Sequence, residues 1–253
     1  MEYYYTRYDG NNQEGLGSIL QAQLHLYAYC RMNNKKMFYP GLKNISHYQY
    51  TQDTEETFSQ KLNNFLNISS DGESGTQYID PSFLIKDWGE KFNQTKKIYI
   101  SELFDKLNYS GNNYFDKSKT TVSIHIRNVN QQDVCFDRNR EYYSENKKIY
   151  FTKLIENLLK IHGSNLDIHI FSQGYESDFE IFTKNFNAHL HLNDDIITTI
   201  YHLIISDILA TSNSSFSWIA HLYGQNKYVY SRNNFFHSWY PSTFFIDNSG
   251  NII

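Results

Sequence analysis

The stretch Thr121-Val122-Ser123-Ile124-His125-Ile126-Arg127 opens the most regular part of this 253-residue chain. Its β-branched residues are bounded by polar segments, which predicts a buried strand. From Thr120 onward, short apolar runs alternate with helical patterns, as is typical of parallel βαβ units. We therefore expect an α/β fold whose second half is an open parallel sheet with helices on both faces.

The elements expected after this strand follow one another at short intervals, with Gly163 as the C-cap of the first helix. Helices are predicted over Tyr150–Ile161, Glu176–Asn185, Asp195–Ser206 and Phe216–Tyr223. Strands are predicted over Leu166–Ser172, Ala188–Leu192, Asp207–Thr211 and Lys227–Tyr230.

The first half shows a weaker version of the same alternation. Strands are predicted over Tyr3–Tyr8, Lys36–Tyr39 and Lys97–Ile100, a loop over Asp9–Gly17, and helices over Ile19–Arg31 and Thr54–Leu66. We therefore predict two αβ domains, residues 1–115 and residues 116–253, that face each other across a cleft. Ligands of such sheets bind outside the carboxyl ends of the strands.

Bulk properties exclude several classes of function. The net charge is −4 and no basic run occurs, so the electrostatic signature of a nucleic-acid-binding protein is missing. Cys30 and Cys135 fit no metal-binding spacing or disulfide framework. The N-terminus does not resemble a signal peptide, and no apolar run reaches the ~18 residues that a membrane span needs. We expect a cytoplasmic chain without a membrane segment, or a catalytic domain from a longer protein.

Three segments contain residues suited to chemistry, and the first is Glu14-Gly15-Leu16-Gly17-Ser18. A glycine-containing turn before a helix brings backbone N–H groups close to a ligand. A pair of glycines before a helix is, however, more often an ordinary tight turn than a binding loop. The third glycine of the dinucleotide-binding motif is absent, which disfavours a dehydrogenase.

The second segment is the end of the strand that was quoted first. Arg127 leaves the carboxyl end of that strand, where its guanidinium can bind phosphate oxygens in a bidentate manner. A surface ion pair is the alternative role for this arginine. His125 lies on the same side of the strand as Arg127 and is expected to be a hydrogen-bonded support rather than a base.

The third segment, Asp207–Trp218, combines a strand, a hydroxyl-rich turn and a helix. Ser214 and Ser215 lie at the expected N-cap, where hydroxyls, free N–H groups and the positive end of the helix dipole can bind an anion. Alternatively, the serines only cap the helix while Phe216 and Trp218 pack it.

Taken together, the segments His125-Ile126-Arg127 and Asn213-Ser214-Ser215-Phe216-Ser217-Trp218-Ile219-Ala220 resemble the donor-site motifs of the fucosyltransferase superfamily. This superfamily comprises α1,2-, α1,6- and protein O-fucosyltransferases, and the second segment is most similar to the α1,2 branch. Ile170-Phe171-Ser172-Gln173 is similar to the family's Phe-Ser-Asp segment, with Gln173 in place of the aspartate. The loop Glu14–Ser18 resembles glycine loops of the same enzymes.

The resemblance implies a GT-B fold of two Rossmann-like domains and an inverting, metal-independent transfer of fucose from GDP-fucose to a glycan or protein hydroxyl. No cofactor is implied beyond the sugar nucleotide, and the sequence contains no Asp-x-Asp motif. Arg127 would stabilise the diphosphate. Glu14 would act as the general base, with Asp133 and Glu141 as alternatives. The implied donor-binding residues are Gly15, Gly17, His125, Arg127, Asn128, Ser172, Asn213, Ser214, Ser215 and Phe216.

The sequence departs from the family next to Arg127. The family's second arginine and a following aspartate are replaced by Asn128 and Asn130. Additional positive charge could come from Arg138, Arg140 or Arg232. The replacements leave two alternatives open: another sugar nucleotide as the donor, or a protein that binds sugar nucleotides or glycans without catalysis.

Overall fold

The structure is a computed structural model. It describes residues 2–6, 15–43, 45–46, 48, 51–86, 90–128, 146–232, 243–247 and 249–253. The chain forms two compact units. Unit 1 contains the described residues up to Ser110 together with Trp218–Gly224, and unit 2 contains the other described residues from Gly111 onward. The predicted domain boundary between residues 115 and 116 stays a prediction.

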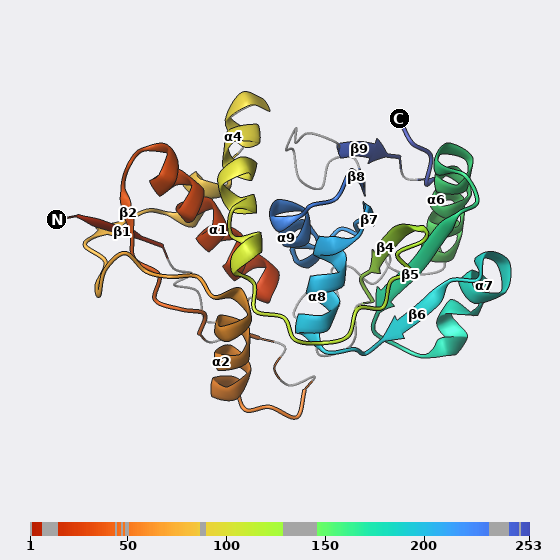
Figure 1. The fold of residues 1–253 in the computed structure, drawn as a ribbon, viewed down its shortest axis with the longest axis horizontal. Helices are drawn as coiled ribbons and strands as arrows, with labels where there is room; N and C mark the ends of the chain where they lie inside the picture. The colour runs from red at the N-terminus through yellow and green to blue at the C-terminus, as the bar shows by residue number, and fades with distance from the viewer. Residues whose placement is uncertain are drawn as a thin grey trace. The chain divides into compact units, whose positions relative to one another are not determined.

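Unit 2 is built on a six-stranded sheet whose neighbouring strands all pair in parallel, in the order β6-β5-β4-β7-β8-β9 (Figure 1). The strands are β4 (Thr120–Ile126), β5 (Leu166–Ser172), β6 (His189–Leu192), β7 (Ile208–Ala210), β8 (Tyr228–Arg232) and β9 (Thr243–Ile246). The chain runs outward from β4 to β6 and then returns to β7 on the other side of β4. This order confirms the predicted α/β class and is that of a Rossmann-like sheet, whose ligands bind where the strand order reverses.

Helices connect these strands on both faces of the sheet. α6 (Asn146–His162) and α7 (Glu176–Phe186) lie on one face, whereas α8 (Ile196–Ile205) lies on the other (Figure 1). α9 (Ser215–Tyr223) follows β7 in the chain. Gly163 follows α6 with φ +82°, a backbone conformation that favours glycine, as expected of a C-cap. Asp195 caps α8 by accepting hydrogen bonds from the N–H groups of Ile197 and Thr198.

The two faces of this sheet differ in chemistry because side chains alternate along each strand. Val122, Ile124 and Ile126 of β4 point into an apolar core formed with α6 and α7. Full burial of an aliphatic side chain of this kind contributes about 1.5–3 kcal/mol. Ser123 belongs to the opposite face, where its hydroxyl donates to the carbonyl of His202 in α8 at 3.0 Å. The first face therefore supplies the core, and the second contains polar groups.

Unit 1 contains a smaller parallel sheet in which β1 (Tyr3–Tyr5) lies between β2 (Lys36–Met37) and β3 (Gln77–Tyr78). Its helices are α1 (Leu16–Met32), α2 (Glu55–Leu66), α3 (Pro81–Ile85) and α4 (Glu90–Ser101), followed by the short 3-10 helix η2 (Phe104–Lys106). α1 is the central helix, and Leu20, Leu24 and Leu26 are completely buried in it. The strands β3 and β9 and the helix α3 were not predicted.

The predicted strand Lys97–Ile100 is wrong, because these residues belong to α4. The isoleucines Ile98 and Ile100 suggest a strand because they alternate and are β-branched. In the structure Ile98 is 62% exposed, while Asn93, Lys96 and Ile100 are buried at intervals of three and four residues. This is the period of a helix, so tertiary packing overrides the local strand preference.

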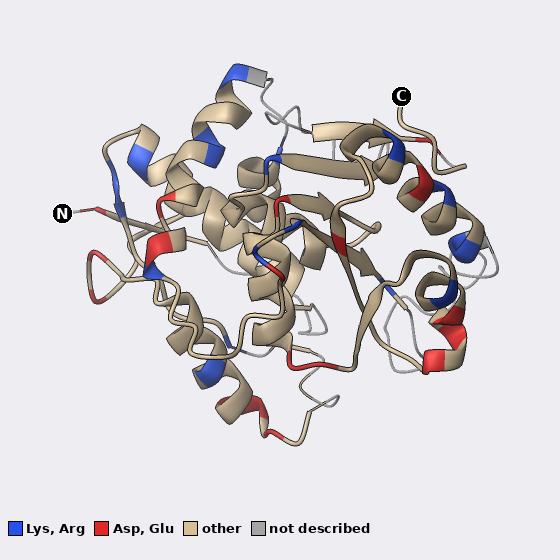
Figure 2. Ribbon diagram, turned by 45° about the vertical axis from the view of Figure 1, so that its right-hand side comes forward, with Lys and Arg blue, Asp and Glu red and all other residues tan. Residues whose placement is uncertain are grey.

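Charged side chains of both signs are interspersed along the described ribbon (Figure 2). Two ion pairs lie within helices of unit 2, Lys153 with Glu156 in α6 and Lys184 with Glu180 in α7. Each pair is exposed and contributes little to stability. Among the described helices, we find none with the length and apolar character needed to cross a membrane.

Candidate functional site at the carboxyl edge of the sheet

The point where the strand order reverses lies between β4 and β7, and two of the predicted motifs meet there. The backbone N–H of Arg127, just after β4, donates to the hydroxyl of Ser212 at 3.3 Å. The same hydroxyl lies 3.1 Å from Nδ1 of His125. Ser212 follows β7 by two residues, so one side chain joins the loops that leave both strands.

His125 supports this junction. Burial, and secondarily the charge of Arg127, lower the pKa of His125 to about 3, so its imidazole is neutral at physiological pH. Because Ser212 accepts from Arg127, its own hydrogen can be donated to Nδ1 of His125, which places the ring proton on Nε2. The ring also packs against Phe216, with 5.3 Å between the ring centroids.

A second junction joins β4 to β5. The hydroxyl of Ser172 donates to the carbonyl of Ile126 at 2.7 Å. Nδ2 of Asn128 donates to the carbonyl of Gln173 at 2.9 Å. Ser172 and Asn128 were both predicted to bind the donor. In the structure their side chains donate to backbone carbonyls, that of Ile126 at the end of β4 and that of Gln173 after β5.

Gly174 is required where this loop turns. Its φ is +128°, and a Cβ at this position would lie 2.9 Å from Nδ2 of Asn128. Its N–H also donates to Oδ1 of Asn193 at 3.1 Å. The absence of a side chain at Gly174 therefore allows the loop after β5 to approach Asn128.

Lys147, in the first turn of α6, is a functional candidate that the sequence did not reveal. Its ammonium donates to Oδ1 of Asn128 at 3.2 Å. Burial lowers the pKa of Lys147 to about 8; Asp178 opposes this shift, and the charge of Arg127 adds to it. The positive charges of Lys147 and Arg127 therefore repel each other at this edge of the sheet. Lys147 was missed because the predicted helix began three residues later, at Tyr150.

The start of α9 fits the capping role that the sequence left open. The hydroxyl of Ser214 accepts from the N–H of Phe216 at 3.3 Å, as an N-cap does. The hydroxyl of Ser217 donates to the carbonyls of Ser214 and Ser212, at 3.1 and 3.4 Å. Ser214 is buried, whereas Ser215 is partly exposed. The N-terminal end of α9 thus follows directly from the loop that carries Ser212.

Several predicted site residues lie elsewhere. Gly15 is the N-cap of α1 in unit 1, and its carbonyl accepts from the N–H groups of Ser18 and Ile19. The helix begins at Leu16, so Gly17 lies within its first turn rather than in the predicted loop. The residues Glu14, Asn130, Asp133, Arg138, Arg140 and Glu141 lie outside the described residues, as does the side chain of Arg232.

One group of described residues has the composition of a metal site. Asp167, His169 and His189 offer ligand atoms that all lie within 4.8 Å of one another. They belong to the first parts of β5 and β6, not to the carboxyl edge. No metal ligand was predicted from the sequence. A usable signal was present, because Asp167 and His169 are two residues apart on a predicted strand and must share a face.

Comparison with known proteins gave no relative. No family model matches the chain, and neither a curated protein nor a solved structure matches it. Function is therefore inferred from the arrangement of the chain's own residues.

Proposed function

We propose that this protein is a glycosyltransferase of the fucosyltransferase type, which transfers a sugar from a sugar nucleotide, GDP-fucose first among them, to a hydroxyl of a carbohydrate or protein acceptor. One observation carries the proposal. The reversal of strand order between β4 and β7 brings His125 and Arg127 to the loop of Ser212, and hydrogen bonds join them there. Rossmann-like sheets bind nucleotides at this position.

The side chains at this edge suit a diphosphate leaving group. The Arg127 guanidinium can bind two phosphate oxygens at once, and Lys147 adds a second positive charge. The N-terminus of α9 supplies backbone N–H groups and the positive end of a helix dipole. A preorganised donor of this kind stabilises a transition state by about 3 kcal/mol. In this proposal the charge that develops on the diphosphate is neutralised by protein groups, without a metal ion.

Glu14 is proposed as the general base that removes the acceptor proton, and a GT-B arrangement would bring it toward the donor. Exchange of Glu14 for glutamine is then expected to abolish transfer while donor binding is retained. Near-normal turnover of Glu14→Gln would exclude this role.

Donor binding gives the most direct test. Isothermal titration with GDP-fucose, and with UDP- and dTDP-sugars for comparison, is expected to show binding of the GDP-sugar. Arg127→Ala is expected to abolish it, because the guanidinium supplies the bidentate contact. Arg31→Ala is the matched control, since Arg31 forms an exposed ion pair with Glu102 in unit 1.

The outcomes of this test separate the alternatives. A ligand at a hundredfold excess over its Kd stabilises the fold by about 2.7 kcal/mol, so thermal unfolding gives an independent readout. Binding of a different sugar nucleotide would keep the enzyme class and change the donor. Wild-type affinity in a folded Arg127→Ala variant would contradict the assignment of Arg127.

A non-catalytic sugar-nucleotide-binding protein is the second candidate. It is favoured by Asn128, which replaces the family's second arginine and donates to the carbonyl of Gln173. The two functions differ in their chemistry on the donor. A transferase is expected to release fucose slowly to water from bound GDP-fucose, whereas a binding protein would leave the donor intact.

A further inference from the structure

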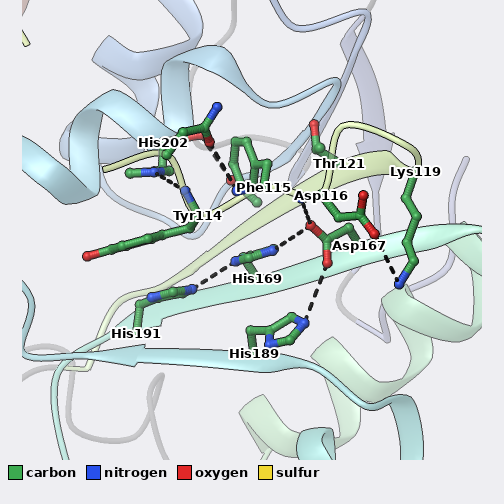
Figure 3. A network of polar contacts seen from close by, with 12 residues as sticks. Tyr114, Phe115, Asp116, Lys119, Thr121, Asp167, His169, His189, His191 and His202 are labelled. Carbon is green, nitrogen blue, oxygen red and sulfur yellow. Dashed lines mark hydrogen bonds and ion pairs between the residues drawn. The ribbon is translucent and has the colours of Figure 1, made fainter. Parts of the chain in front are cut away.

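The polar face of the unit 2 sheet contains a cluster of imidazole and carboxylate groups (Figure 3). In the register of β5 and β6, His169 pairs with His189 and Phe171 pairs with His191. Asp167 lies two residues before His169 and therefore shares its face. We call Asp167, His169, His189 and His191 the histidine cluster.

The carboxylate of Asp167 is the centre of the histidine cluster. Its Oδ2 lies 2.8 Å from Nε2 of His169 and accepts from the backbone N–H of Asp116 at 2.8 Å. Its Oδ1 lies 3.5 Å from Nε2 of His189. The side chains of Asp167 and His169 are 3% exposed, and that of His189 is 55% exposed. Two of the three candidate ligands are thus fixed by burial, and the third is open to water.

A row of three polar contacts extends from Asp167 to Asp194. Nδ1 of His169 lies 2.8 Å from Nε2 of His191, and Nδ1 of His191 lies 3.5 Å from Oδ2 of Asp194. The remaining contact is the one between Asp167 Oδ2 and His169 Nε2. Two neutral imidazoles provide only two N–H groups. If both imidazoles are neutral, one of the three contacts has no hydrogen, and either an additional proton or a metal ion in the row would remove this mismatch.

A metal ion on Nε2 of His169 would complete this row. It would take the place of the hydrogen between His169 and Asp167. Nδ1 of His169 would then donate to His191, and Nδ1 of His191 would donate to Asp194. A histidine that binds a metal through one nitrogen and donates from the other is the usual arrangement in metal sites.

We propose that Asp167, His169 and His189 form a binding site for a divalent transition metal ion, with Zn²⁺ as the preferred ion. Two imidazole nitrogens and one carboxylate oxygen are typical Zn²⁺ ligands, and water completes the tetrahedron. Mg²⁺ and Ca²⁺ are disfavoured because they prefer oxygen ligands throughout. Ligand distances of about 2.0–2.2 Å require the exposed His189 side chain to turn inward. They also require the 2.8 Å contact between His169 and Asp167 to widen, because two ligand atoms of a tetrahedral ion lie roughly 3.3 Å apart.

This metal site would be structural and separate from the proposed donor site. Its ligands lie in the first parts of β5 and β6, whereas the donor site lies at the carboxyl ends of the strands. Asp167 also accepts from Asp116, which lies in the segment before β4. Tyr114 of that segment stacks between the rings of His191 and His202, at 4.4 and 4.2 Å. The ion would therefore join β5, β6 and the chain leading into β4.

Zn²⁺ titration of protein without an affinity tag, after treatment with a chelator, tests the site. One equivalent of Zn²⁺ is expected to bind and to raise the unfolding temperature, whereas Mg²⁺ has no effect. His189→Gln is the informative variant because this side chain is exposed and its loss leaves the buried contacts in place. It is expected to weaken Zn²⁺ binding roughly tenfold or more. Co²⁺ gives an independent readout through the visible absorption of its tetrahedral complexes.

His162→Gln is the matched control, since His162 lies in unit 2 and contacts Tyr230 instead of the cluster. It is expected to bind Zn²⁺ as the wild type does. The proposal is overturned if the wild type binds no stoichiometric Zn²⁺, in which case the cluster is an ordinary hydrogen-bond network. It is equally overturned if His189→Gln binds with unchanged affinity.

Discussion

Single side chains at the carboxyl edge of the sheet determine which charges a ligand meets there. Ser212 connects the backbone of Arg127 to the ring of His125, and Asn128 holds the ammonium of Lys147. Arg127 is charged at any physiological pH, but burial lowers the pKa of Lys147 to about 8. The charge available to an anion at this edge therefore changes in mildly alkaline solution.

Donor binding is expected to weaken as the pH rises above about 8, the pKa to which Lys147 is lowered. A bound diphosphate favours the charged ammonium and raises its pKa, so the complex holds a proton that the free protein loses in this range. Titration calorimetry at several pH values checks this. Lys147→Met is expected to remove the dependence, while Lys148→Met, an exposed neighbour, should retain it. Equal slopes for Lys147→Met and the wild type would contradict the role of Lys147.

Among the elements, the loop after β5 depends on glycine for its path. Gly174→Ala is expected to lower the free energy of unfolding by about 1–3 kcal/mol, since φ of +128° is strained for alanine and the new Cβ would displace Asn128. Urea denaturation measures the change. Gly163→Ala is the control, because a Cβ there has no neighbour within 4 Å and meets only the backbone strain of φ +82°. Equal losses in both variants would show that the contact with Asn128 is unimportant.

The same elements show what a sequence can predict. β5 was predicted with its observed bounds because apolar residues alternate with Asp167 and His169 along Leu166–Ser172, and such alternation is typical of strands. The last part of α4, Lys97–Ile100, was mistaken for a strand because the helical period becomes visible only when Asn93 and Lys96 are known to be buried. Burial of polar residues is a tertiary property that local patterns do not reveal.

In the candidate site, too, some features could be predicted from local sequence patterns and others depend on tertiary structure. The proximity of Arg127 to Ser212 could be expected, since both follow parallel strands and carboxyl ends share one edge. Lys147 could not be expected there, because it precedes Tyr150, the first residue of the helix that was predicted from the sequence. Side-chain contacts between neighbouring strands could not be predicted from the sequence either. His169 and His191 lie 2.8 Å apart only because β5 and β6 pair in one particular register.

At the scale of the whole molecule, unit 1 contains a lysine, Lys97, that is only partly exposed. Nζ of Lys97 in α4 donates to the carbonyls of His221 and Gly224, at 2.6 and 3.4 Å. Burial lowers the pKa of Lys97 from 10.5 to about 8. Between these two values the folded chain holds fewer protons at this group than the unfolded chain, so its contribution to stability rises with pH.

The difference in unfolding free energy between the wild type and Lys97→Met is therefore expected to be constant below pH 8. Above it, the difference should grow in favour of the wild type as the pH approaches 10.5. The slope is at most about 1.4 kcal/mol per pH unit. Denaturant unfolding of both proteins across this range measures it, and the comparison cancels the other titrating groups. Parallel curves would show that Lys97 is solvated in the folded protein.

The helix α9 has a consequence for how the chain can be divided. Its first three residues belong to unit 2, while Trp218–Tyr223 belongs to unit 1, where Trp218, Ile219 and Leu222 are almost completely buried. No single cleavage of the polypeptide can release either unit with all its residues. A fragment beginning at Gly111 would carry these apolar side chains without the residues that cover them. A shortened gene that encoded only the second unit is therefore expected to yield a protein with exposed apolar surface that is prone to aggregation.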